Sequence, residues 1–345
     1  MYITLKFRIK GRTRWLDNLV EEVNFVWNYC NNLSFYMIKN HRRWLSWFDF
    51  CKYLKGSTSD GGLNIHSHSV QQIAKEYFEK RKNLRRVKLR YRGIKSLGWL
   101  PFTNQSLTLR NNTFFYTKHA INVFGKIPLN MVIKCGSFNQ DSKGNWYLNL
   151  VVEDQPKECT STQEVGIDLG LKDLATLSTG EKIENPQFYR KTEEKLAKAQ
   201  RARKKKLVRN LHNKIKNQRK DFLHKASTKI AKENKLIVVG NVNSSKLAKT
   251  TMAKSVNDVG WYAFKQMLKY KSIRHSATYL EVDESWTTQT CNVCKNRTGP
   301  KGLEGLGIRE WVCCDCGSVH DRDTNSAINI LRLGHQALAE GASIC

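Results

Sequence analysis

The stretch Val165-Gly-Ile-Asp-Leu-Gly170 is a short apolar run that stops at a carboxylate placed between two glycines. Short apolar runs bounded by turn signals are typical of buried strands. A second run, Leu174–Leu177, follows after a tight turn, and Lys235–Val239 and Tyr279–Val282 repeat the pattern further along. Because helical patterns separate the later runs, the sequence predicts an α/β domain that begins near residue 164.

Three helices are expected in this part of the chain, over about Asn185–Asn234, Val259–Tyr270 and Thr324–Leu333, with a short tail after the last. The first is very basic over Lys191–Lys206. We expect this run to lack the acidic partners four residues away that would neutralise a solvated helix face. Contact with nucleic acid is therefore favoured, and a solvated face is the alternative.

The first half of the chain has a different pattern. Residues 2–9 alternate like a strand, helical periodicity covers about Trp15–Lys55 and Ser67–Leu84, and short strand-like runs then continue to Val152. Asn, Gly and Asp turns separate these runs, which predicts a small barrel or sandwich with the first strand as an extra member. The polar segment Glu153–Gln163 is the expected domain boundary.

The charge of the chain indicates its partner. There are 59 Lys and Arg against 30 Asp and Glu, a net charge of +29. Positive charges in such excess repel one another in the folded state. They favour binding to a polyanion, above all nucleic acid. A basic surface that serves only solubility is the alternative. The apolar content of 40% predicts packed cores rather than disorder.

The compartment follows from what the sequence does not contain. No window approaches the roughly 18 apolar residues of a membrane span, and the first residues lack the apolar block of a signal peptide. We therefore expect a cytosolic protein, in the cytosol of a bacterium or archaeon and associated with the nucleoid. Ten cysteines in that compartment favour metal binding over disulfides.

Two C-x-x-C knuckles, Cys291-Asn-Val-Cys294 and Cys313-Cys-Asp-Cys316, lie 18 residues apart. Each knuckle brings two thiolates to one ion, so the pair predicts a structural Zn²⁺ site made by Cys291, Cys294, Cys313 and Cys316, with no open position for water. Cys314 does not have the C-x-x-C spacing to another cysteine of its knuckle, so we do not expect it to bind the ion. His320 is a possible substitute ligand, less favoured than the four thiolates.

Acidic residues at strand ends are the candidates for a catalytic metal site. Carboxylates from separate elements can hold two Mg²⁺ ions that align an attacking water and stabilise the leaving oxygen of a phosphodiester. Asp168 ends its strand, and Asp323 lies where the last helix begins. Each has a structural alternative, since Asp168 could cap a turn and Asp323 could cap the helix. The strand Lys235–Val239 continues into Gly240 and Asn241, so it supplies no acid.

Several motifs in order resemble one family. They are Val165–Thr176, Arg219–Thr228, Trp286–Cys294 and Cys316–Ile330, with Gly98-Trp-Leu-Pro-Phe102 in the first half. Together they resemble TnpB, the transposon-encoded RNA-guided nuclease related to type V CRISPR effectors, and the resemblance covers the whole chain. It implies a mixed α/β and β multidomain fold: an RNase H-like (RuvC) nuclease domain with an inserted zinc ribbon, and a wedge-type β-barrel carrying a helical recognition insert.

The resemblance also implies domain limits. Residues 1–10 and 86–155 would form the wedge-type barrel, 11–85 the recognition insert, 164–288 and 318–335 the nuclease domain, 289–317 the zinc ribbon and 336–345 the tail. Asp168 and Asp323 would be the first and third catalytic acids. The second motif departs from the family, because Gly240-Asn241 stands where most relatives have Glu-Asp.

Two explanations of that departure remain open. One is a nuclease that has lost activity, similar to the TnpB-derived RNA-guided repressors. The other is a relocated acid, as in the Fanzor relatives, where the substitute lies in the strand before the zinc motif. Glu284 occupies that place, 44 positions after Gly240, and we favour it. Glu281 and Asp283 are nearby alternatives, and strand alternation should turn Asp283 the other way.

The function implied is that of an RNA-guided DNA endonuclease of a transposable element, using two Mg²⁺ ions at Asp168, Glu284 and Asp323. A guided repressor is the alternative, and a transposase that joins DNA ends is disfavoured because no joining domain is visible. Guide RNA and target DNA would be the partners of a chain expected to be monomeric on one RNA. The expected nucleic-acid contacts are Lys82, Arg85, Arg86, Lys88, Arg90, Arg92, Arg201, Arg203, Lys204, Lys205, Arg219 and Lys225.

A second set of contacts would read a short motif next to the target. Amide and lysine side chains can bond base edges in duplex DNA. The candidates are Gln71, Gln72, Lys75, Thr103 and Asn104. Near the nuclease site, Arg322 could neutralise a phosphate or pair with Asp321.

Overall fold

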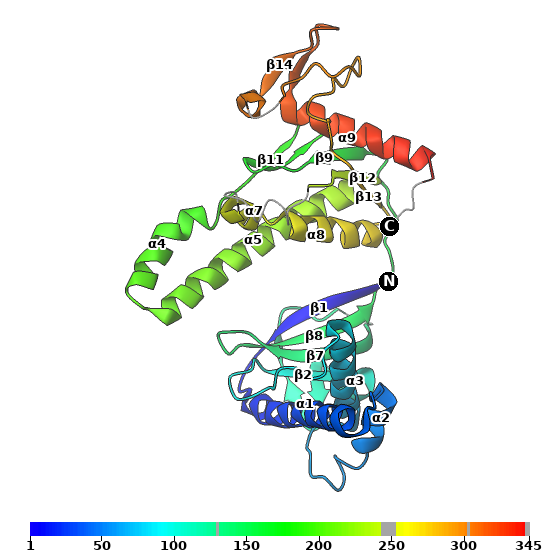
Figure 1. Ribbon diagram of the computed structural model, residues 1–345, viewed down its shortest axis with the longest axis vertical. Helices are drawn as coiled ribbons and strands as arrows, with labels where there is room; N and C mark the ends of the chain where they lie inside the picture. Colours follow the sequence, from blue (N-terminus) through cyan, green and yellow to red (C-terminus); the bar gives the residue numbers. More distant parts are fainter. Residues whose placement is uncertain (129–130, 243–252, 302–303, 342–345) are drawn as a thin grey trace. The chain divides into compact units, whose positions relative to one another are not determined.

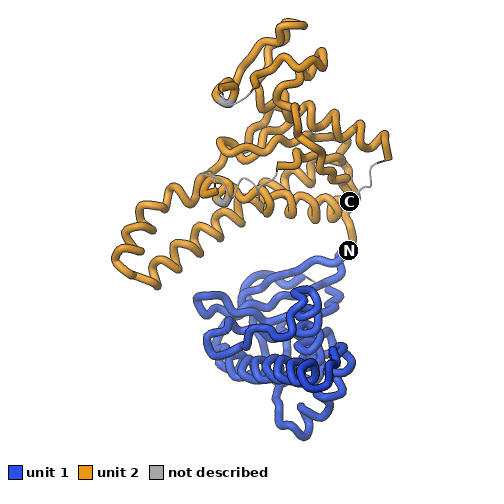
Figure 2. The backbone as a smooth tube through the Cα atoms, viewed as in Figure 1, with its two compact units in different colours: residues 1–154 blue, residues 155–345 orange. Residues whose placement is uncertain are grey.

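The computed structural model describes residues 1–128, 131–242, 253–301 and 304–341. The chain divides into two compact units, Met1–Asp154 and Gln155–Cys345 (Figure 2). The division falls at the start of the polar segment Glu153–Gln163. Among the described helices, none combines the length and the apolar character that a membrane crossing requires.

The first unit is built on antiparallel sheets. The larger sheet has the order β2-β7-β8-β1-β6, and the smaller has the order β3-β4-β5 (Figure 1). Their bounds are β1 Tyr2–Ile9, β2 Trp99–Thr103, β3 Leu107–Arg110, β4 Thr113–Tyr116, β5 His119–Ile121, β6 Val123–Phe124, β7 Val132–Gln140 and β8 Trp146–Glu153. Alternate residues of β8, from Trp146 to Val152, are buried in one core. The expected first strand pairs with β8, so the two ends of this unit meet in one sheet.

Helices α1 (Arg14–His41), α2 (Trp47–Tyr53) and α3 (Ser67–Leu84) pack on the larger sheet and on one another. The prediction of one helical pattern over Trp15–Lys55 was wrong in one respect, because two helices cover it. Helix α1 ends where Arg42 takes a left-handed conformation with φ 50°. Ser46 and Asp49 then form a capping box that starts α2.

The second unit contains a five-stranded mixed sheet in the order β11-β10-β9-β12-β13. Its strands are β9 Glu164–Asp168, β10 Asp173–Leu177, β11 Lys182–Glu184, β12 Leu236–Gly240 and β13 Thr278–Val282. Strands β9, β12 and β13 are parallel, and β10 runs antiparallel between β9 and β11. The carboxyl ends of three parallel strands therefore lie at one edge of the sheet.

Helices cover both faces of this sheet (Figure 1). Ile237 and Val239 pack with α5 (Lys205–Glu233) and α8 (Trp261–Arg274), while Leu236 and Val238 pack with α9 (Arg322–Ala339) on the other face. Successive side chains of β12 thus point to opposite faces of the sheet, and the strand contributes to the apolar core on each face. The last helix was expected to end near Leu333, and instead it continues to Ala339.

The single long basic helix expected over Asn185–Asn234 was also wrong. Two helices, α4 (Arg190–Arg201) and α5, pack side by side with a turn between them (Figure 1). Arg203 in that turn has φ 50°, which no helix interior allows. Leu196 and Ala199 are buried, so α4 folds back because it has a small apolar face to cover.

The segment between β13 and α9 contains a two-stranded antiparallel hairpin, β14 (Glu310–Val312) and β15 (Val319–Asp321). A short helix, α7 (Ala253–Val259), precedes α8. Strand β15 runs directly into α9, so the hairpin and the last helix are joined without a linker.

Candidate active site and metal centre

Four acidic side chains, Asp168, Asp173, Glu284 and Asp323, line one cavity of about 390 Å³. Asp168 ends β9, Glu284 follows β13 by two residues, and Asp323 lies in the first turn of α9. Arg309 and Arg322 line the same cavity. The structure therefore brings together the three acids predicted from the sequence, at the edge where the parallel strands end.

The charges of these acidic side chains shift one another's pKa. Burial, and next the negative charges of Glu284 and Asp323, raise the pKa of Asp168 to about 7. The Ser326 hydroxyl and the Arg322 charge oppose that rise. Burial also raises the pKa of Glu284, against the opposing charge of Lys265. The carboxylates therefore act on one another across the cavity, but among the described residues only the four cysteines gather their ligand atoms within 4.8 Å of one another.

Gly240 explains why the second acid comes from β13. A Cβ atom on Gly240 would lie 2.6 Å from Glu284 Oε2 and 3.2 Å from Glu284 Cβ. Gly240 pairs with Val282 across the parallel ladder, so Glu284 reaches over the end of β12 from the neighbouring strand. A side chain at position 240 would therefore force the Glu284 carboxylate to move from its observed place.

The two nearby alternatives lie outside this cavity. Asp283 is exposed, and its carboxylate accepts hydrogen bonds from the Ser285 backbone N–H at 3.0 Å and hydroxyl at 2.7 Å. Glu281 accepts from Lys265 Nζ and from the Tyr279 hydroxyl, both at 2.8 Å. Neither is among the residues that line the cavity.

Asp323 is not the helix cap that its sequence position allowed. Asp321 caps α9, accepting from the Thr324 backbone N–H at 2.9 Å, and pairs with Lys182 at 2.7 Å. Asp323 is thereby left to face the cavity. Arg322 Nη1 donates to the Gly305 carbonyl at 2.9 Å.

Arg309 was missed from the sequence. Its Nη1 lies 2.9 Å from Asp323 Oδ2 and 3.2 Å from Oδ1, although the two residues are 14 positions apart. Arg309 sits between the two cysteine knuckles, just before β14. No local pattern marks it, because its position depends on how the ribbon folds back on α9.

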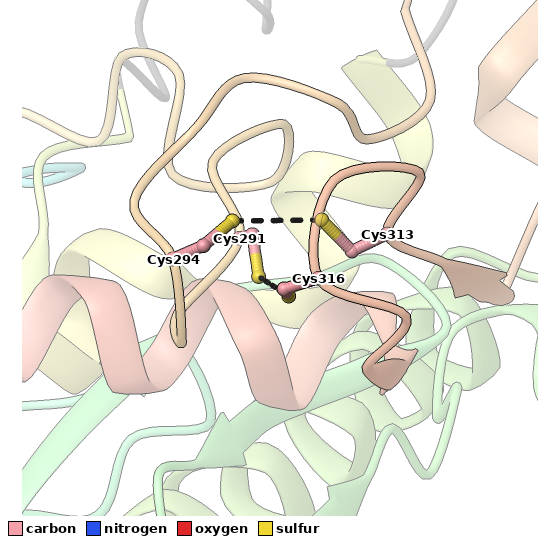
Figure 3. A group of neighbouring side chains, drawn as sticks. All are labelled: Cys291, Cys294, Cys313 and Cys316. Carbon is pink, nitrogen blue, oxygen red and sulfur yellow. Dashed lines mark hydrogen bonds between the residues drawn. The ribbon is translucent and has the colours of Figure 1, made fainter.

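The second site is the cysteine cluster. Sulfur atoms of Cys291, Cys294, Cys313 and Cys316 all lie within 4.8 Å of one another. Figure 3 shows the two knuckles facing each other, with Cys291–Cys316 and Cys294–Cys313 sulfur distances of 3.6 Å. A tetrahedral ion with metal–sulfur bonds of about 2.3 Å needs sulfur atoms about 3.8 Å apart. The cluster can hold a metal ion, and exposed Cys314 is not part of it.

Polar neighbours contact these sulfur atoms. His320 Nε2 lies 3.1 Å from Cys291 Sγ, Thr298 Oγ1 3.1 Å from Cys313 Sγ, and Ser318 Oγ 3.2 Å from Cys316 Sγ. Trp311 packs on the His320 ring with centroids 4.6 Å apart. His320 therefore supports a thiolate from beside the cluster, while the four cysteines supply the ligand atoms.

Asparagines of α9 attach the segment that carries the first cysteine knuckle to the last helix. Asn325 and Asn329 donate to the Thr290 carbonyl at 2.8 Å and 2.7 Å. The Asn325 side chain also accepts from the backbone N–H of Asn292 in the first knuckle at 2.9 Å. The segment after Glu284 is thus fixed to the helix that carries Asp323.

The predicted nucleic-acid residues differ in their surroundings. Those with exposed side chains are Lys82, Arg85, Arg86, Lys88, Arg90, Arg201, Arg203, Lys204, Lys205 and Lys225. Arg219 is instead partly buried and bonded to the buried Asp258 at 3.1 Å, so its cation is already paired within the fold. The basic run also has an acidic partner that we expected it to lack, since Glu194 pairs with Lys198 at 2.6 Å.

The candidate readers of the adjacent motif lie in the first unit. Gln71, Gln72 and Lys75 are on α3, while Thr103 ends β2 and Asn104 begins the short 3₁₀ turn after it. Helix α3 packs against both β2 and that turn. The structure thus puts the two groups on neighbouring elements, with Gln72 and Thr103 partly buried and the others exposed.

Known proteins resemble this chain in sequence and in fold. The family model described as "Probable transposase" matches residues 147–251, and the one described as "Cas12f1-like, TNB domain" matches residues 261–330. The fold resembles that of the Cas12f1 chain in a Cas12f1–sgRNA–target DNA complex, with a TM-score of 0.60 over 92% of this chain and 82% of that one, at 12% identity. The chain therefore has a fold like that of the Cas12f1 chain, with a cysteine cluster that could hold a metal ion.

Sequence relatives make the assignment narrower. A putative RNA-guided DNA endonuclease of Streptomyces pristinaespiralis is 35% identical over 295 residues, which cover 80% of this chain and 71% of that protein. The putative RNA-guided DNA endonuclease InsQ of Escherichia coli K12 is 29% identical, over 59% of this chain and 57% of InsQ. The chain belongs to the TnpB family.

Proposed function

We propose that the protein is an RNA-guided DNA endonuclease in which Asp168, Glu284 and Asp323 hold Mg²⁺ and phosphodiester bonds are hydrolysed. The names of its relatives and the fold that it shares with a guide-bound, target-bound complex support this proposal. The chemistry of the cavity supports it as well, because three oxygen donors and two arginines match a divalent cation and a phosphate group.

The nuclease domain is assigned an RNase H-like (RuvC) fold. If its five strands are numbered in chain order, their order across the sheet is third, second, first, fourth, fifth. The second strand runs antiparallel to the others. This is the strand order of RNase H-like folds, and α9 then brings the last acid back to the first strand. The two sheets of the first unit are assigned to the wedge-type domain, with α1 to α3 as its recognition insert.

Each side chain of the cavity has a separate task. Asp168 and Glu284 would hold Mg²⁺ from the sheet side and Asp323 from the helix side. Bound Mg²⁺ would supply the positive charge that makes a water nucleophilic and stabilises the leaving oxygen. Arg309 and Arg322 would bind the scissile phosphate, because a guanidinium group forms paired hydrogen bonds to phosphate oxygens.

One observation carries the choice between an active nuclease and a guided repressor. Glu284 fills the space at Gly240 from which the usual glutamate would extend. A nuclease that had only lost its second acid would have no reason to place another carboxylate there. The relocation therefore preserves the three-acid site.

The cysteine cluster would hold Zn²⁺ as a structural ion. Its role in catalysis would be to position the ribbon, since Arg309 between the knuckles contacts Asp323. Guide RNA and target DNA would occupy the exposed basic residues of both units, and Gln71, Lys75 and Asn104 would contact the motif beside the target.

The test compares the RNA-bound protein with its Glu284→Gln variant on target DNA in the presence of Mg²⁺. Glutamine keeps the shape and removes the charge, so cleavage should fall about a hundredfold or more. Asp283→Asn is the matched control, because Asp283 is one residue away and exposed, and it should cut at the normal rate. Equal cleavage by Glu284→Gln would refute the metal-site assignment, and absence of cleavage by the wild type with retained DNA binding would indicate a guided repressor.

A further inference from the structure

The chain between α3 and β2 contains a basic segment whose backbone is held by side chains. Residues 88–92 belong to no helix or strand. Asn31 nevertheless accepts from the Leu89 backbone N–H at 2.9 Å and donates to the Leu89 carbonyl at 2.8 Å. Asn28 does the same for Arg92, at 2.9 Å and 2.7 Å. Each asparagine thus replaces the neighbouring strand that this segment lacks.

These contacts form a ladder along one face of α1. Trp27 Nε1 donates to the Arg90 carbonyl at 3.2 Å, and Asn24 accepts from Arg92 Nε at 2.8 Å. The Tyr91 hydroxyl donates to Asn32. The donors and acceptors recur three or four residues apart, which is the spacing of one helix face. The segment is therefore fixed in place without any ligand, and its outward side chains are fixed with it.

A hollow of about 850 Å³ opens beside the ladder. Lys80, Arg90 and Lys95 line it together with Arg92, whose guanidinium is already bonded to Asn24 and to the Leu97 carbonyl. None of the described residues that line it is acidic. The exposed apolar side chains of Tyr91 and Ile94 line it too, and Ile94 is fully exposed to water. Cations next to exposed apolar and aromatic surface suit a ligand that is anionic at one end and flat and apolar at the other.

An unpaired nucleotide is such a ligand. Its phosphate matches the three cations, and its base can stack on an aromatic ring and cover apolar surface, which bases inside a duplex cannot do. We propose that this hollow binds an unpaired nucleotide of single-stranded RNA, with Arg90 on the phosphate, Tyr91 under the base and the asparagine ladder holding both. The choice of RNA rests on the proposed function, in which the guide is bound before DNA arrives.

The first experiment locates the RNA. A short oligouridine carrying 4-thiouridine is cross-linked to the full chain by light, without DNA, at about 150 mM salt to suppress non-specific binding. Cross-links should concentrate on residues 90–97. Unlabelled RNA should compete better than single-stranded DNA or duplex DNA of the same length. Cross-links elsewhere, or better competition by either DNA, would overturn the proposal.

Paired variants then separate stacking from folding. Tyr91→Ala should weaken binding of the same oligouridine about fivefold or more, whereas Tyr91→Phe, which keeps the ring and loses only the hydroxyl bond to Asn32, should bind within about twofold of the wild type. Arg90→Ala should lower the slope of log affinity against log salt by about 0.7, the value for one phosphate contact on a single strand. Lys143→Ala, which removes an exposed cation outside the hollow, should leave that slope unchanged. Equal affinity of Tyr91→Ala and Tyr91→Phe would refute stacking.

The ladder is tested as a positioning device with Asn28→Ala. This variant should keep the thermal midpoint of the chain within a few degrees but spread the cross-links beyond residues 90–97. An unchanged cross-link pattern would refute the positioning role. Cross-linking does not require DNA cleavage, so the two proposals fail separately. If the chain cleaves DNA but RNA does not cross-link to residues 90–97, only this RNA site is refuted. If RNA cross-links there but the chain does not cleave DNA, only the nuclease proposal is refuted.

Discussion

The cysteine cluster and the acidic cavity lie in the same unit and differ in how completely each is prepared for its ion. The four sulfur atoms already lie at distances that fit one ion, and His320, Thr298 and Ser318 contact three of them. In the acidic cavity, burial, and next the charges of Glu284 and Asp323, instead raise the pKa of Asp168, and Asp323 is paired with Arg309. A closed set of soft ligands suits a permanent ion, while an open set of repelling hard ligands suits ions that arrive with the substrate.

Of the substitutions that test this difference between the two sites, loss of a cysteine ligand should have the largest effect on the protein. Cys291→Ser should abolish bound zinc, because it removes one of the four thiolate ligands. The loss should also destabilise the ribbon, since binding of a structural Zn²⁺ contributes on the order of 10 kcal/mol to the folding of such sites. Cleavage should be lost as well, since the ribbon carries Arg309. Cys314→Ser is the control, because exposed Cys314 lies outside the cluster, and it should keep one zinc per chain by atomic absorption. Normal zinc content in Cys291→Ser would contradict the assigned ligand set.

The repulsion in the acidic cavity should appear as a pH dependence of stability. The pKa of Asp168 is raised from 3.8 to about 7 in the folded chain. The folded state therefore binds the proton more tightly, and the stability that this supplies is fully present below about pH 4 and lost as the pH rises through about 7. Without Mg²⁺, up to about 4 kcal/mol should be lost over that window.

Asp168→Asn should flatten this part of the profile, measured by urea unfolding at several pH values. The same variant should remove the gain in Mg²⁺ affinity that the wild type shows as the pH rises through about 7, because the ion displaces the Asp168 proton. A profile that keeps its shape in Asp168→Asn would show that another group is responsible.

The smallest effect is expected at Gly240. Gly240→Ala should destabilise the chain by about 1–3 kcal/mol, because the new Cβ overlaps Glu284. In a Glu284→Ala background the same change should cost much less, and a double-mutant cycle of urea midpoints measures the difference. Gly93→Ala, where a Cβ meets no atom within 4 Å, serves as the control. Additive effects of the two substitutions would mean that the side chains do not compete for space.

The sequence predicted those features that depend on local patterns. The strand ending at Asp168 and the knuckle spacing of the cysteines each follow from a few adjacent residues. Asp323 was offered as a cap of the last helix, whereas Asp321, two residues earlier, is the cap, because the helix begins at Arg322 rather than at Thr324. The turn at Arg203 was missed for a similar reason, because arginine is a good helix former and its left-handed conformation depends on how α4 packs on α5.

The contact of Arg309 with Asp323 and the competition between Gly240 and Glu284 could not be predicted in detail. Both depend on distances between segments far apart in the sequence. The resemblance to TnpB pointed to Glu284 as a substitute, whereas the overlap at Gly240 gives the physical reason for the exchange. The asparagines on α1 were visible in the sequence but matched no apolar period.

Gly166 sets a further limit on the nuclease site. A Cβ atom there would lie 2.1 Å from the Ala327 carbonyl oxygen of α9, so the helix rests directly on the backbone of β9. Asp168 is two residues beyond Gly166, and Asp323 is one helical turn before Ala327. The absence of a side chain at Gly166 thus sets how far apart Asp168 and Asp323 stand, and any larger residue there would widen the gap between these two acids.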